Sequence, residues 1–200
     1  MRKAMSMMIG AAIVLCGFAA EGNRGKVLVS DDFSGPELQK PWKALKGAWK
    51  ISDGVLTGSE IAEDKHAAVI RRPLKFTNAA FEIPFQLNGA KTFHLSINDK
   101  GGHLCRVSID PKGFVLRRDK PNAKSEVKAV VLARHAMAIE SGKWYTLQVE
   151  ISGTKFTARV GDGHVASAEH PDLGGEKLDI GLPVSGQSAA FKYVHAWELN

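Results

Sequence analysis

The sequence predicts an all-β fold built as a sandwich of two antiparallel sheets. Three features support this prediction: apolar and polar residues alternate, short turn motifs separate the alternating segments, and helical periodicity is nearly absent. Residues 81–88, 92–98 and 105–110 place apolar side chains at every second position. A strand that buries one face against a core and exposes the other has this period of two.

Turn motifs predict where the strands end. Hairpin signals occur at 52–54 (Ser-Asp-Gly), 88–89 (Asn-Gly), 99–102 (Asp-Lys-Gly-Gly), 110–113 (Asp-Pro-Lys-Gly) and 161–163 (Gly-Asp-Gly). Further strands are expected at 26–33, 48–51, 54–58, 67–76, 113–118, 127–134, 143–152, 154–160, 164–168, 178–184 and 190–199. Pro84 predicts an edge strand or a bulge, since proline cannot donate to a sheet. Residues 34–47 and 119–126 are expected to be irregular.

Residues 1–19 are predicted to be an export signal. Arg2 and Lys3 give it a positive start, residues 9–18 carry no charge, and 17–19 (Gly-Phe-Ala) suits cleavage before Ala20. The apolar run is shorter than the ~20 residues that span a bilayer, so no stable membrane anchor is expected after cleavage. Lipidation is not favoured, because Leu15 precedes Cys16 where a small residue is required. We therefore expect a single periplasmic or extracellular domain over 20–200.

Charge and cysteine content exclude several classes of function. The formal net charge is +6 and falls to +4 without Arg2 and Lys3, and no run of Lys and Arg exceeds two residues. No clustered basic stripe is present, so nucleic acid is not an expected partner. Cys105 is the only cysteine after residue 19, so no internal disulfide and no cysteine-based zinc site can form. Its place among core-facing residues indicates a buried, inert thiol.

Several segments of the chain resemble a known family. Residues 32–35 (Asp-Phe-Ser-Gly) precede a Trp-x-Ile-x-Asp-Gly-x-Leu hairpin at 49–56. Residues 142–147 (Gly-Lys-Trp-Tyr-Thr-Leu) and 180–182 (Ile-Gly-Leu) follow in the same order. Over about residues 30–199 this order is similar to the secreted 3-keto-disaccharide hydrolase domains, also described as family-16-glycoside-hydrolase-like.

The resemblance implies a concanavalin A-like jelly-roll sandwich with a saccharide ligand. It also implies that Trp49 and Trp144 are large core anchors. Two positions depart from the family pattern, since Asn98 stands where relatives have Arg and Arg106 about where they have Glu. The framework of the family is therefore matched more fully than its site.

The polar faces of the central strands supply the candidate site. A curved sandwich can bind an extended ligand on such a face through hydrogen-bonding side chains. The same polarity is expected of a face that is merely solvated. The predicted substrate-binding residues are His94, Asn98, Arg106, Glu82 and Gln86. Among them, His94 has the chemistry of an acid or base near neutral pH.

No catalytic residue is assigned. Glycoside hydrolysis needs two carboxyl groups facing one sugar, and glucanases of this architecture carry Glu-x-Asp-x-x-Glu on one strand, which is missing from this sequence. The seven histidines form no His-x-His or His-x-x-x-His pair. Calcium is implied only through relatives of the fold, and the spacing of the loop aspartates matches no calcium loop. We therefore expect no metal and no other cofactor.

Three functional hypotheses follow. The first is a secreted carbohydrate-active domain that hydrolyses 3-keto-disaccharides or related glycosides. The second is a non-catalytic carbohydrate-binding or structural module. The third is an extracellular interaction protein without a sugar ligand.

Overall fold

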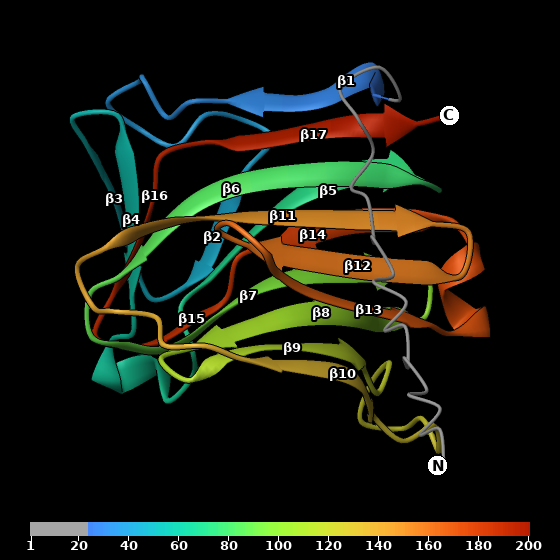
Figure 1. Cartoon of the computed structure of the whole chain (residues 1–200). Coiled ribbons are helices and arrows are strands. Elements are labelled where there is room, and N and C mark those ends of the chain that lie inside the picture. Colours follow the sequence, from blue (N-terminus) through green and yellow to red (C-terminus); the bar gives the residue numbers. More distant parts are fainter. Residues whose placement is uncertain (1–23) are drawn as a thin grey trace, which may run out of the picture.

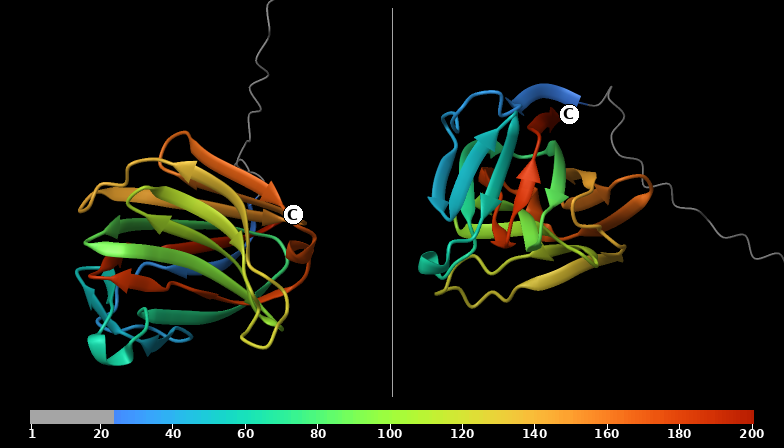
Figure 2. Two further views of the ribbon diagram at one scale, coloured as in Figure 1. Left: turned by 90° about the horizontal axis from the view of Figure 1, so that it is seen from below. Right: turned by 90° about the vertical axis from the view of Figure 1, so that its left-hand side faces the viewer.

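The computed structural model describes residues 24–200, which form two antiparallel β-sheets packed face to face (Figures 1 and 2). The predicted two-sheet, all-β fold is confirmed. The predicted export signal and its cleavage site lie outside the described residues.

One sheet has nine strands. Its main path runs β13-β12-β11-β6-β16-β4-β3, with β17 also beside β6 and β1 beyond β17. These strands are β1 (Arg24–Asp31), β3 (Ala48–Ser52), β4 (Val55–Ser59), β6 (Ala79–Leu87), β11 (Trp144–Ser152), β12 (Lys155–Val160), β13 (His164–Glu169), β16 (Ala189–Phe191) and β17 (Val194–Leu199).

The other sheet has eight strands in the order β10-β9-β8-β7-β14-β5-β2, with β15 paired to β7. They are β2 (Lys43–Lys46), β5 (Val69–Phe76), β7 (Ala90–Asp99), β8 (Gly102–Asp110), β9 (Gly113–Arg118), β10 (Val130–Ala136), β14 (Lys177–Gly181) and β15 (Val184–Gly186). The described residues also contain two short 3-10 helices, η2 (Ala62–Asp64) and η3 (Pro171–Gly174).

Four of the five predicted hairpins are confirmed, and they join β3 to β4, β7 to β8, β8 to β9 and β12 to β13. The prediction of a hairpin at Asn88-Gly89 is wrong, because this turn carries the chain from one sheet to the other. Both Asn88 N–H and Ala90 N–H donate to the carbonyl oxygen of Ser188, at 2.9 and 3.1 Å. The turn is therefore held by a distant segment, and β6 and β7 never pair.

The expectation that Pro84 marks an edge strand is wrong, because β6 is paired on both sides. Pro84 lies opposite Thr146 of β11. On its other side the partner changes from β17 to β16, and its carbonyl accepts from Lys192 N–H at 3.2 Å. Because N–H and C=O of one strand residue point to the same neighbour, the donor that proline lacks falls at this break between two partner strands.

The other differences concern strand boundaries. The segment 34–47 contains β2 at its end, and the expected strand 178–184 ends at Gly181, with β15 following. The expected strand 190–199 is divided into β16 and β17 around Lys192. Residues 119–126 form no strand, as predicted.

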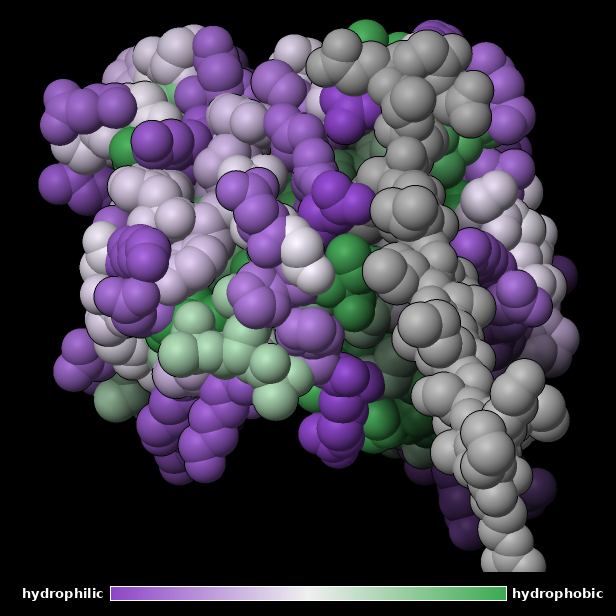
Figure 3. Space-filling view, viewed as in Figure 1, coloured by the Kyte–Doolittle hydropathy of each residue, from purple (hydrophilic) through white to green (hydrophobic). Residues whose placement is uncertain are grey.

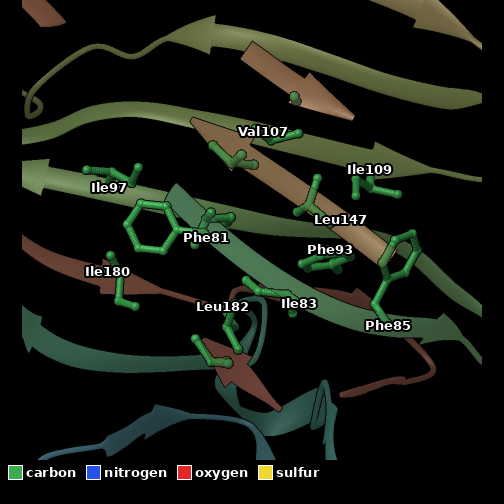
Figure 4. Packing of buried hydrophobic residues seen from close by; sticks show 14 of the residues in the cluster. Phe81, Ile83, Phe85, Phe93, Ile97, Val107, Ile109, Leu147, Ile180 and Leu182 are labelled. Carbon is green, nitrogen blue, oxygen red and sulfur yellow. The ribbon is translucent and has the colours of Figure 1, made fainter. Parts of the chain in front are cut away.

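The core lies between the sheets, where the inner faces interdigitate (Figure 4). Phe93 of β7 contacts Phe85 of β6 and Phe191 of β16 across the gap, with ring centroids 5.0 and 5.1 Å apart. Cys105 is fully buried and free, and its burial raises the pKa of the thiol. The predicted buried cysteine is confirmed.

Tryptophan placement differs from the prediction. Trp42 is the buried one, at 4% exposure, and its Nε1–H donates to Asp31 at 2.8 Å. Trp49 packs only partly against the core, over Gly58 of the neighbouring strand. Trp144 faces outward from β11, so it is not a core anchor.

A bulge in β14 reverses the alternation of that strand. Lys177 is fully buried and donates through Nζ to the carbonyls of Thr77 and Leu173, at 2.6 and 2.5 Å. Asp179, two residues later, lies on the outer face. The register shift between them accounts for this, since a bulge adds one residue to a strand.

Gly47 gives a test of how tightly the turn after β2 is packed. Both Gly47 and Gly142 have positive φ, +74° and +79°. A Cβ on Gly47 would lie 2.6 Å from Ala68 Cα and from Ser59 O, whereas nothing lies within 4 Å of one on Gly142.

We expect Gly142→Ala to lower the free energy of unfolding by about 1–2 kcal/mol, the cost of a left-handed backbone. Gly47→Ala should cost about 1–3 kcal/mol more, because the added atom overpacks. Urea denaturation of both variants measures the difference. Equal losses would contradict the tight packing described here.

Candidate functional site

The outer face of the eight-stranded sheet carries a hollow of about 490 Å³. Because Phe93, Leu95 and Ile97 of β7 point into the core, the residues between them point outward, toward this hollow. The walls of the hollow are formed by Leu45, Lys46, His66, Ala67, Val69, Arg71, His94, Ser96, His103, Arg106 and Pro183. Two of the five predicted site residues, His94 and Arg106, are among them.

His94 is held between two hydroxyl groups. Its Nδ1 lies 2.7 Å from Ser108 Oγ on the neighbouring strand, and its Nε2 lies 3.4 Å from Thr92 Oγ1. Burial, and then the charges of Arg106 and Arg117, lower the pKa of His94 to about 3. The ring is therefore neutral at pH 7, where it can donate and accept hydrogen bonds but does not titrate.

Arg106 of β8 is fixed by an acid from the end of β9. Its Nε–H donates to Asp119 Oδ2 at 2.6 Å, and the Asp119 side chain is only 3% exposed. A bond between two ions is shorter and stronger than a neutral one. The guanidinium of Arg106 is thus oriented before any ligand arrives.

A second chain of polar contacts crosses β5, β14, β7 and β8. Arg71 donates to Asp179 at 2.6 Å, and Asn98 donates to the other carboxylate oxygen of Asp179 at 3.3 Å. Asn98 Oδ1 in turn lies 3.1 Å from His103 Nδ1. Asn98 therefore stands beside the hollow and holds His103, which lines it.

The structure does not bring Glu82 and Gln86 to this face. Both lie on β6, so they project from the outer face of the nine-stranded sheet, on the opposite side of the sandwich. Glu82 accepts from Tyr193, Gln148 and Arg24, at 2.8, 3.2 and 3.4 Å. Burial raises the pKa of Glu82, but these hydrogen bonds and the Arg24 charge outweigh it and lower the pKa.

The opposite face has a hollow of its own, about 680 Å³, beside Trp144 and Tyr193. Lys192 Nζ lies 4.6 Å from the centre of the Trp144 ring, so this ring face is covered by a cation of the chain itself.

Figure 3 shows the molecule from the side of Figure 1, where hydrophilic side chains dominate and apolar areas between them are small.

Several site residues were missed by the sequence analysis. Arg71 and Asp179 are 108 residues apart, and nothing local indicates that β5 and β14 pair. Asp119 was expected only as part of an irregular segment. Arg117 lies between Leu116 and Arg118 on β9, and both of these neighbours are buried. The alternation of side chains along the strand could therefore have assigned Arg117 to the outer face.

The described residues contain no group of three or more His, Cys, Asp and Glu placed to hold a metal ion. Two histidines, His135 and His164, do lie close together, with ring nitrogens 3.0 Å apart. Within 24–200 no helix is long and apolar enough to cross a membrane.

No protein-family model matches the chain, and no curated protein matches it in sequence. Solved structures do match. The carbohydrate-binding module CBM66 from Bacillus subtilis is 19% identical, with a TM-score of 0.64 over 78% of this chain and 95% of that one. The laminarinase from Rhodothermus marinus is 11% identical, with a TM-score of 0.65 over 88% and 98%.

A third similar structure is the CBM2 module of the evolved Dit protein of Lactobacillus casei BL23 phage J-1. It is 11% identical, with a TM-score of 0.67 over 88% of this chain and 97% of that one. Such low identities define a shared fold. The chain is a jelly-roll sandwich of two antiparallel sheets, as predicted.

The depressed pKa of His94 predicts a pH dependence of stability. Between about pH 6.5 and 3 the unfolded chain binds a proton at His94 that the folded protein does not bind. Stability therefore falls as pH falls through this window, with a slope from this group of up to about 1.4 kcal/mol per pH unit. Urea denaturation from pH 7.5 to 4 measures it.

His94→Gln should flatten this slope, whereas Gln86→Ala, which removes no titratable group, should keep the wild-type slope. Identical slopes in wild type and His94→Gln would show that His94 becomes protonated in the folded state as easily as in the unfolded chain.

Proposed function

We propose that the protein is a saccharide-binding domain whose ligand lies in the hollow on the eight-stranded sheet. The observation that carries the proposal is the set of fixed hydrogen-bonding groups there. Arg106 is held by Asp119, Arg71 by Asp179, and neutral His94 by Ser108. Groups that are already oriented lose little entropy on binding.

The chemistry of these groups suits sugar hydroxyls. A hydroxyl both donates and accepts, so it can meet a guanidinium N–H on one side and a neutral imidazole or serine on the other. A carbohydrate-binding module and a laminarinase share the fold, which supports the same class of ligand. The predicted export signal would put this domain in the periplasm or outside the cell, where glycans are available.

Hydrolysis of a glycoside in the same hollow is a second candidate. It is favoured by one observation: Asp119 and Asp179 each pair with an arginine that lines the hollow, so two carboxylates lie directly behind its wall. The resemblance in sequence names 3-keto-disaccharides as the substrate class. Binding ranks first, because each carboxylate is engaged by an arginine, and a general acid must hold a proton that such a partner disfavours.

Binding is tested by isothermal titration calorimetry of the mature protein with laminarin, polygalacturonate and a 3-keto-disaccharide. Arg71→Gln and His94→Gln should each weaken the best ligand at least about tenfold, the effect of losing a charged or buried hydrogen bond. The Arg71–Asp179 pair is partly exposed, so Arg71→Gln should still fold.

Gln86→Ala is the matched control on the opposite sheet and should bind like wild type. If Gln86→Ala lost binding while Arg71→Gln kept it, the ligand would lie on the nine-stranded sheet. Absence of heat with every saccharide at millimolar concentration would refute the proposed function.

Catalysis is tested separately by product formation. Sugar release from the bound ligand that disappears in both Asp119→Asn and Asp179→Asn, with binding retained, would establish the hydrolase. Binding without any product establishes the module.

A further inference from the structure

The walls of the hollow are positively charged. They include Lys46, Arg71 and Arg106, and no carboxylate. The acids that pair with these cations stand outside the wall, and the Asp119 side chain is 3% exposed. The Arg106 side chain is 28% exposed, so at this pair a ligand in the hollow meets the cation before the acid.

Arg117 adds a charge without a partner. It lies directly opposite Arg106 in the β8–β9 register, and its side chain points to the same outer face. Its Nε is buried without a hydrogen-bond partner, and no salt bridge among residues 24–200 includes Arg117. Two like charges directly across a sheet repel each other, and a buried donor without an acceptor is unfavourable.

Both arginines lie close to the same imidazole. The charges of Arg106 and Arg117 each lower the pKa of His94, whereas Asp119 is the acid that bonds to Arg106. One carboxylate thus stands against two guanidinium groups. The balance of this corner is positive, and an anion from outside would relieve the repulsion between the two guanidinium groups.

The rest of the wall indicates what carries that acceptor. No Trp, Tyr or Phe lines the hollow, so neither a base nor a neutral sugar ring has an aromatic face to stack on. Hydroxyl groups of Thr92 and Ser96 lie on β7, and that of Ser108 lies on β8, the strand of Arg106. Hydroxyls beside arginines suit a sugar that bears an acidic group.

We infer that the saccharide bound in this hollow is acidic and that one of its carboxylate or sulfate groups lies between Arg106 and Arg117. This inference rests on the proposed function and names the substrate class for the same site. A guanidinium pairs with a carboxylate or a sulfate through parallel N–H bonds, so either group would serve.

The test measures affinity of the mature protein for polygalacturonate, dextran sulfate and neutral laminarin, in 50 and 300 mM NaCl, by isothermal titration calorimetry. One acidic polymer should bind at least tenfold tighter than laminarin at low salt, and high salt should weaken it severalfold. Which of the two binds better identifies the acidic group.

Arg117→Gln should weaken the acidic polymer at least tenfold and leave thermal stability unchanged or higher, since it removes an unsatisfied buried donor. Arg117→Lys should restore part of the affinity by returning the charge. The matched control is Lys155→Gln, which removes one positive charge at the exposed first residue of β12, in the opposite sheet. It should stay within twofold of wild type.

Each failure has a distinct result. Laminarin binding as tightly as the acidic polymers, without salt dependence, would overturn the acidic ligand and leave the saccharide-binding function standing. If Lys155→Gln lost as much affinity as Arg117→Gln, the net charge of the protein would explain the binding, and the specific place between Arg106 and Arg117 would be overturned. Single-stranded DNA bound as tightly as polygalacturonate, with the same loss in Arg117→Gln, would overturn the saccharide class. No binding of any polymer would remove both proposals.

Discussion

The contact of Phe93 with Phe85 and Phe191 joins the two sheets, and the rest of the structure depends on it. Each of these rings is buried, and burying one aromatic side chain contributes about 1.5–3 kcal/mol. Because side chains alternate along β7, fixing which residues face the core also fixes which residues face outward. His94 and Ser96 face outward because their neighbours in sequence face inward.

Ion pairs hold the charged side chains of this outward face in fixed positions. The pairs Arg106–Asp119 and Arg71–Asp179 each join different strands or segments, both at 2.6 Å. Pairs of this kind contribute modestly to stability when they are partly exposed. Their larger effect here is geometric, because they set where the guanidinium groups stand around the hollow. Arg117 lies on the same face and lacks such a partner, which leaves this side of the sheet with an excess of positive charge.

Local patterns predicted the parts of the fold that depend on neighbours in sequence. The alternation of Phe93 with His94 and the turn at Asp53 required no knowledge of distant residues, and both are confirmed. The pattern could not show which sheet a strand joins. Glu82 and His94 have the same local signature, yet the turn at Gly89 carries the chain between the sheets and puts them on opposite sides of the molecule. Long-range pairing decides this, and a single sequence does not display it.

The bulge in β14 constrains how the chain can vary in length. Lys177 and Asp179 face opposite sides only because an extra residue stands between them. A regular strand of the same length would place both side chains on one face, and would turn either the lysine away from its two carbonyls or the aspartate into the core. Deletion of Leu178 has the opposite effect, because it makes Lys177 and Asp179 neighbours, and neighbours in a regular strand face opposite sides. The length of this segment and the bulge are therefore coupled: the buried anchor of η3 and the partner of Arg71 can both be kept if the extra residue and the bulge are lost together.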